Sequence, residues 1–142
     1  MVPGGVKIPV PFGFAFSHGA TVKSVAPAKD WDGKYNDGQA RDEETGERLW
    51  LVTVEDLDPK AAEFGRDRLK VKVVAPVQPV PPDPMVLPGG LSITPVELTD
   101  LVLTPWVDDS RCKTSNHRCR ARLAWSMRAS GLIAPQAAQA AA

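Results

Sequence analysis

Two segments of the chain alternate basic and apolar residues. The basic residues are Arg68, Lys70 and Lys72 in the first segment, and Arg118, Arg120, Arg122 and Arg128 in the second. Successive side chains of a β-strand point to opposite faces, so each segment would present a row of cations on one face. Such rows can bind the phosphates of a nucleic acid and release its condensed counterions. If both rows lie on one side of a sheet, they form a candidate DNA-binding surface.

The overall charge of the chain limits this interpretation. Its 17 basic and 17 acidic residues cancel, so any binding of a polyanion has to come from a local patch. The alternative is a solvated sheet face whose charges discourage edge-to-edge aggregation. The sequence leaves both interpretations open.

Aromatic residues offer a second kind of contact with nucleic acid. Trp31 and Tyr35 lie in a polar segment, and Trp106 follows a proline on an expected edge strand. Exposed rings of this kind can stack on bases, which gives affinity with little sequence preference. The alternative is that they pack beneath loops. Trp50 and Trp125 fall on the apolar faces of their strands, where we expect them to join the core.

The chain carries no recognisable catalytic motif. Its two histidines, His18 and His117, stand outside any known signature, and no nucleotide-binding or metalloprotease pattern is present. Adjacent carboxylates such as Asp108 and Asp109 could hold a divalent ion, but solvated loop charge is the better interpretation. We therefore expect a protein that is not an enzyme and that has no cofactor and no bound metal.

Cys112 and Cys119 bracket a short segment that contains His117. Two thiolates and an imidazole could bind zinc, but a structural site usually needs a fourth ligand. The sequence favours reduced thiols, with a hairpin disulfide as the main alternative and zinc as a minor one.

The elements that would position these residues are mostly strands. We expect strands over residues 20–27, 48–57, 68–75, 91–98, 101–107 and 118–129, and one helical turn or a loop over residues 59–66. Pro76, Pro79 and Pro82 then recur every third residue, which is the period of a polyproline II helix.

This order predicts an all-β fold, a small antiparallel barrel of five or six strands. It would be similar to an oligonucleotide-binding (OB) barrel, with the proline-rich strap between the third and fourth strands. We expect an extended N-terminal arm over residues 1–17, the barrel over residues 18–134 and a disordered tail over residues 135–142. No apolar run is long enough to span a membrane and the N-terminus makes a poor signal peptide, which predicts a cytoplasmic protein.

Several segments resemble one known family. They are HGATVKSVAP, KDW, RDEETGERLWLVTVEDLDP, RLKVKVVAPVQPVPP, LTPWV and RLAWSMRASGL, and together they extend over residues 18–135. The most specific of them is KVVAPVQPVPP. The chain is similar in these segments to the plasmid replication, integration and excision activators of actinobacterial integrative conjugative elements. It departs from the family pattern in the Cys112–Cys119 segment and in residues 32–39, both of which are expected loops.

The resemblance implies a regulatory protein that switches on the replication, excision and integration genes of a mobile element. With the basic rows, it leads to the hypothesis of a protein that contacts the element's DNA, with single strands favoured over duplex. The alternative is an adaptor that recruits a replication initiator or a transcription protein without touching DNA. The sequence does not decide the oligomeric state.

Overall fold

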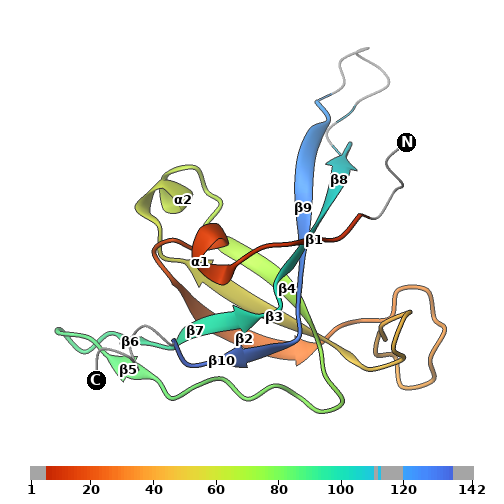
Figure 1. The fold of residues 1–142 in the computed structure, drawn as a ribbon, viewed down its shortest axis with the longest axis horizontal. Coiled ribbons are helices and arrows are strands. Elements are labelled where there is room, and N and C mark those ends of the chain that lie inside the picture. Colours follow the sequence, from red (N-terminus) through yellow and green to blue (C-terminus); the bar gives the residue numbers. More distant parts are fainter. Residues whose placement is uncertain (1–5, 111, 113–119, 136–142) are drawn as a thin grey trace.

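The computed structural model describes residues 6–110, 112 and 120–135, and in this part of the chain nearly all regular structure is β (Figure 1). The strands are β1 (Ile8–Pro9), β2 (Ala20–Pro27), β3 (Leu49–Asp56), β4 (Arg68–Val74), β5 (Met85–Val86), β6 (Ser92–Ile93), β7 (Pro95–Thr99), β8 (Val102–Asp108), β9 (Arg122–Ala129) and β10 (Gly131–Ile133). Two short helices are present, α1 (Phe12–Ala15) and α2 (Pro59–Glu63). Within the described residues, no helix has the length and apolar character needed to cross a membrane.

Eight strands form one curled sheet in the order β1-β8-β9-β4-β3-β2-β7-β10, and β5 pairs with β6 in a separate hairpin. The prediction of a mostly β fold is therefore confirmed. The prediction of a purely antiparallel sheet is wrong at one place, because β4 and β9 run parallel, with Val71 opposite Met127 and Val73 opposite Ala129. A parallel pair requires a long connection, and here the chain passes through β5 to β8 between these two strands.

A long bent hairpin completes the sheet. Strands β7 and β8 pair along their length with β10 and β9, so that Thr99 lies opposite Gly131 and Asp108 lies opposite Arg122. The bend falls at Asp100, which has a φ of 50° and accepts a hydrogen bond of 2.7 Å from the Ser130 hydroxyl. One half of the hairpin closes against β2 and β4, while the other half projects from the body as a two-stranded ribbon (Figure 1).

The core lies inside the curl of the sheet. Val52 and Val54 of β3 and Val71 and Val73 of β4 are fully buried, as their alternation with polar residues predicts. Trp50 shares this face, and its indole Nε1 donates a hydrogen bond of 2.9 Å to the Ala75 carbonyl oxygen. The prediction that Trp50 belongs to the core is confirmed.

Trp125 does not belong to the core, so that prediction is wrong. Its side chain is 46% exposed, because β9 extends past the body into the ribbon and no second layer of described residues covers it there. The N-terminal segment also differs from the extended arm that we expected. Its described part contains β1, which pairs with β8, and α1, and Phe16 at the end of α1 is buried against the core.

In the proline-rich linker between β4 and β7, two of the three prolines spaced three residues apart are partly buried, and the first, Pro76, is exposed. Pro79 and Pro82 are partly buried, whereas Val77 and Val80 are 71% and 82% exposed. One edge of a polyproline II helix packed on the body would give this pattern. The strap itself stays a prediction, and the predicted tail after Pro135 lies outside the described residues.

Candidate functional site

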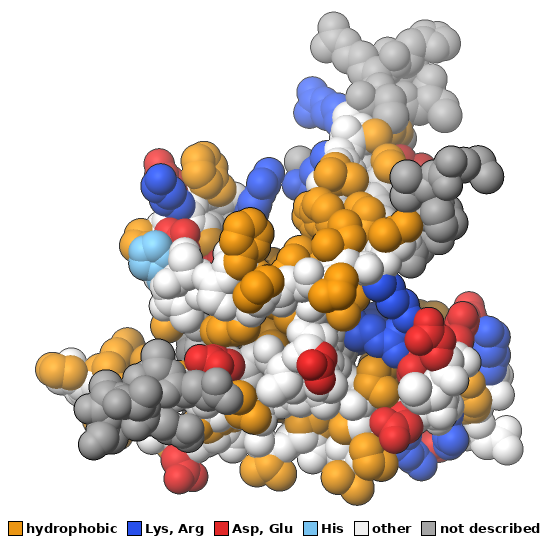
Figure 2. Space-filling view, in the orientation of Figure 1, with side chains coloured by type: hydrophobic (Ala, Val, Ile, Leu, Met, Phe, Trp, Pro, Cys, Tyr) orange, Lys and Arg blue, Asp and Glu red, His pale blue; other side chains and the backbone are white. Residues whose placement is uncertain are grey.

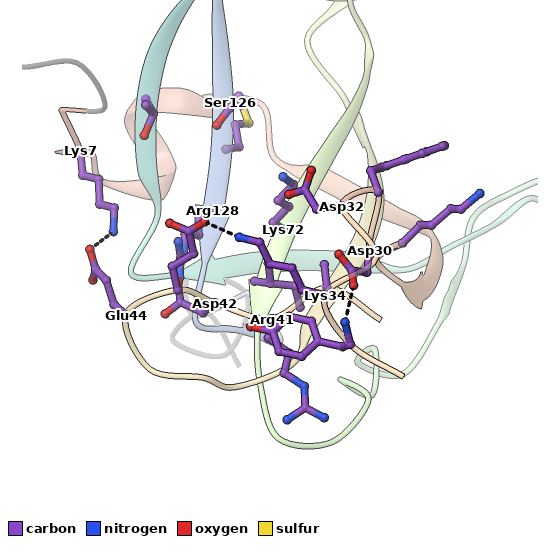
Figure 3. A pocket seen from close by; sticks show the side chains of 18 residues that line it. Lys7, Asp30, Asp32, Lys34, Arg41, Asp42, Glu44, Lys72, Ser126 and Arg128 are labelled. Carbon is purple, nitrogen blue, oxygen red and sulfur yellow. Dashed lines mark hydrogen bonds and ion pairs between the residues drawn. The ribbon is translucent and has the colours of Figure 1, made fainter. Parts of the chain in front are cut away.

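A groove of about 440 Å³ lies between the loop of residues 28–48, which joins β2 to β3, and the outer surface of β4, β8 and β9. Lys72 of β4, Thr104 of β8 and Ser126 and Arg128 of β9 line its sheet side. The loop contributes most of the other residues, and Lys7 reaches the groove from the N-terminal segment (Figure 3).

The loop that forms one wall is held by hydrogen bonds. Backbone pairs tie Ala40 to both Ala28 and Leu49, and the buried Gln39 side chain donates a hydrogen bond of 2.9 Å to the Leu49 carbonyl oxygen. A second turn follows, in which the Asp42 carboxylate accepts hydrogen bonds from the Thr45 amide and hydroxyl. Gly46 adopts a φ of 75°, a conformation that favours glycine. The loop therefore presents its side chains in defined positions.

The first predicted row of cations lies on the outer face of β4. Arg68, Lys70 and Lys72 are exposed, whereas Leu69 between them is partly buried and Val71 is fully buried. None of the three cations forms an ion pair with another described residue. Lys72 lies opposite Arg128 in the parallel register of β4 and β9, so the two predicted rows meet at this pair.

The second row is mostly neutralised or outside the described residues. Arg128 forms an ion pair with Asp42, and the Arg122 Nε lies 3.4 Å from an Asp108 carboxylate oxygen. Arg120 is exposed just before β9, and Arg118 lies outside the described part of the chain. The unpaired charges in this region therefore come chiefly from β4.

Burial opposes the ionisation of Asp42, but hydrogen bonds and charge attraction from Arg128, with hydrogen bonds from Thr45, outweigh it and lower its pKa from 3.8 to about 2. Only 3% of its side chain is exposed, against 29% for Arg128. This pair therefore fixes the loop to β9, and Figure 3 shows the two side chains near each other.

Other cations of the groove are also paired with carboxylates. The Lys7 Nζ lies 2.5 Å from a Glu44 oxygen, and the Lys34 Nζ lies 3.8 Å from a Glu43 oxygen. Arg41 lies 3.4 Å from Asp37. Figure 2 shows blue and red side chains intermingled beside the projecting ribbon. The groove is therefore close to neutral, although it contains many basic residues.

The predicted stacking residues are divided between two places. Trp31 and Tyr35 both line the groove, and the Trp31 ring is 83% exposed. Cations cover these rings: the Lys29 Nζ lies 4.3 Å from the Trp31 ring centroid, and the Arg41 guanidinium lies 5.0 Å from that of Tyr35. Trp106 is half-exposed on the ribbon, opposite Ala124, and does not line the groove.

Sequence reasoning missed the residues that close the groove. Lys7 and Asp42 are separated from their partners by 37 and 86 positions, so no local pattern connects them. The only signal in the sequence is the acidic run of Asp42, Glu43 and Glu44.

No candidate metal centre lies in the described residues. No group of three histidine, cysteine or carboxylate side chains is close enough to hold an ion there. Asp108 instead accepts hydrogen bonds from Ser110 and pairs with Arg122, and these contacts lower its pKa. Cys112 is disulfide-bonded, so reduced thiols were the wrong expectation for it. Cys119 and His117 lie outside the described residues.

A separate apolar surface lies on the projecting ribbon (Figure 2). Val107 and Leu123 face each other across its two strands and are 64% and 63% exposed, with Trp125 beside them at 46%. Among the described strands, this half of β9 pairs only with β8, because β4 pairs with β9 from Met127 onward. The ribbon therefore offers exposed apolar side chains next to an open strand edge.

Comparisons with protein-family models, with curated proteins and with solved structures found no match to this chain.

Proposed function

We propose that this protein is a non-enzymatic accessory protein of a mobile genetic element that binds single-stranded DNA along the outer face of β4. The observation that carries the proposal is the position of Lys72. It belongs to the unpaired row with Arg68 and Lys70, and it also lines the groove that contains Trp31 and Tyr35. Phosphate contacts and base stacking can therefore act on one strand at the same time. A role in replication, integration and excision rests on the family resemblance of residues 18–135.

The strand order supports an OB-like barrel as the finer description of the fold. Strands β2, β3 and β4 follow one another, β9 lies beside β4, and β7 pairs with β2. If β7–β8 and β9–β10 each count as one bent strand, five strands follow one another around the curl. Barrels of this class bind oligonucleotides on the face of their second and third strands, between the first and the last loops. Residues 28–48 would be the first of these loops, and the proline-rich linker would occupy the position between the third and fourth strands.

Single strands suit this surface better than duplex DNA. Stacking on Trp31 and Tyr35 requires bases that are not already stacked in a helix. The groove cations that carboxylates neutralise would add little to the attraction, so we expect binding of moderate strength, with a log–log salt slope of about −0.7 for each phosphate that the unpaired cations neutralise.

Fluorescence polarisation with labelled single-stranded and duplex oligonucleotides tests this proposal. At ~50 mM salt, where phosphate attraction is strong, the protein should bind the single strand more tightly than the duplex, because only the single strand offers unstacked bases to Trp31 and Tyr35. If neither oligonucleotide binds, the proposed function is wrong.

The apolar ribbon favours a second candidate, an adaptor that recruits a replication initiator or a transcription protein. Its open strand edge could accept a strand of the partner while Val107 and Leu123 pack against it. Val107→Ser/Leu123→Ser should then abolish capture of a partner that survives nuclease treatment of a host lysate. Val77→Ser/Val80→Ser, which changes two exposed valines of the linker, is the matched control. Release of the partner by nuclease would contradict the adaptor.

A further inference from the structure

Three consecutive carboxylates of the groove loop each pair with a cation from a different part of the chain. Asp42 pairs with Arg128 of β9, Glu43 with Lys34 of the same loop, and Glu44 with Lys7 of the N-terminal segment. All six residues line the groove. We name residues 42–44 the acidic turn.

These carboxylates pair with cations that could otherwise contact the phosphates of a nucleic acid. Lysine and arginine bind phosphate and carboxylate oxygens with the same charge-assisted hydrogen bonds. While Glu43 and Glu44 hold Lys34 and Lys7, those two cations are not available to a phosphate. The acidic turn thus competes for Lys34 and Lys7 with a nucleic acid bound at the neighbouring β4 row.

The members of the acidic turn differ in how firmly they are held. Asp42 is buried and accepts hydrogen bonds of 2.8 and 3.2 Å from Thr45, so it anchors the turn. The side chains of Glu43 and Glu44 are 89% and 70% exposed, and their ion pairs contribute little to stability in water. Removing these two charges should therefore leave the fold intact.

We propose that Glu43 and Glu44 are a built-in competitor that limits the affinity of the groove for single-stranded nucleic acid by occupying Lys34 and Lys7. The inference rests on the proposed function, and it adds a means of regulating it. A change that removes the two carboxylate charges makes two more cations available beside Lys72.

The test compares Glu43→Gln/Glu44→Gln with a control of equal charge change, Glu63→Gln/Asp83→Asn. Glu63 and Asp83 are exposed, lie outside the groove lining and form no ion pair with a described residue. The first variant should bind a labelled single-stranded oligonucleotide about fivefold more tightly than the control, and its log–log salt slope should steepen by about 1.4, or ~0.7 for each added phosphate contact.

Equal affinity of the two variants, or weaker binding by Glu43→Gln/Glu44→Gln, would overturn the inference and leave the proposed function standing if the unchanged protein binds. Absence of binding by all three proteins would overturn both. Thermal unfolding of each variant, which should occur at the same temperature as for the unchanged chain, verifies that the proteins compared are folded.

Discussion

The basic residues of β4 and those of the groove differ in what faces them. Lys70 and Lys72 project from the sheet without an ion pair to any described residue, whereas Arg128 and Lys7 are each paired with a carboxylate. The basic residues of β4 and those of the groove lie on neighbouring strands and loops. A count of charges in the sequence does not distinguish them. The comparison shows that the partner of a charge, and not its presence, decides whether it can bind a ligand or holds the fold together.

The Asp42–Arg128 pair should give the largest effect on the fold. Asp42→Asn removes a buried carboxylate charge that compensates the partly buried guanidinium of Arg128, so we expect the free energy of unfolding to fall by roughly 2–3 kcal/mol. Urea denaturation measures this change. An effect as small as that of Glu43→Gln, whose carboxylate is exposed, would contradict the role of the Asp42–Arg128 pair in holding the fold together.

Lowering the pH should remove the contribution of the Asp42 carboxylate to the stability of the unchanged protein. Because folding lowers the pKa of Asp42 from 3.8 to about 2, its ionised form stabilises the fold above pH 3.8 and this contribution is lost as the pH falls to 2. The difference in stability between the unchanged chain and Asp42→Asn should therefore narrow by about 2 kcal/mol over this range. A difference that stays constant with pH would contradict this assignment.

Changes in the β4 row should affect binding and not stability. Lys70→Gln/Lys72→Gln should lower the affinity for a single-stranded oligonucleotide about tenfold, because two phosphate contacts are lost. Lys60→Glu, on α2, changes the net charge by the same amount and serves as the control. A drop in the unfolding temperature of the double variant would mean that these lysines have partners after all.

Trp31 should give the smallest effect. Its ring is 83% exposed at the groove, so Trp31→Ala should weaken binding about fivefold through the loss of one stacked base and leave the unfolding temperature unchanged. Phe64→Ala is a matched control, because Phe64 is also exposed but lies at the end of α2. Equal loss of affinity in both variants would show that Trp31 is not part of the binding site.

Local alternation was enough to predict much of the sheet. The bounds of β2, β3 and β4 agree with the sequence within one residue at each end, because their apolar residues are buried on one face. Alternation also placed the cations of β4 on the outer face. It could not show that Trp125 is exposed, since a pattern identifies a face but not whether another layer covers it.

The groove could not be predicted in the same way. Its ion pairs join residues such as Asp42 and Arg128 that meet only after the sheet has curled and the long hairpin has folded back. The parallel pairing of β4 and β9 likewise depends on the path of the intervening chain. Phe16 was missed because a four-residue helix has too little sequence for a periodic signal.

The salt dependence of binding tests the central claim most directly. We would compare Lys70→Gln/Lys72→Gln, which changes unpaired cations, with Lys7→Gln/Lys34→Gln, which changes paired ones. The account predicts that the log–log salt slope for a single-stranded oligonucleotide becomes shallower by about 1.4 in the first variant and by less than half of that in the second. An equal or larger change in the second variant would contradict it.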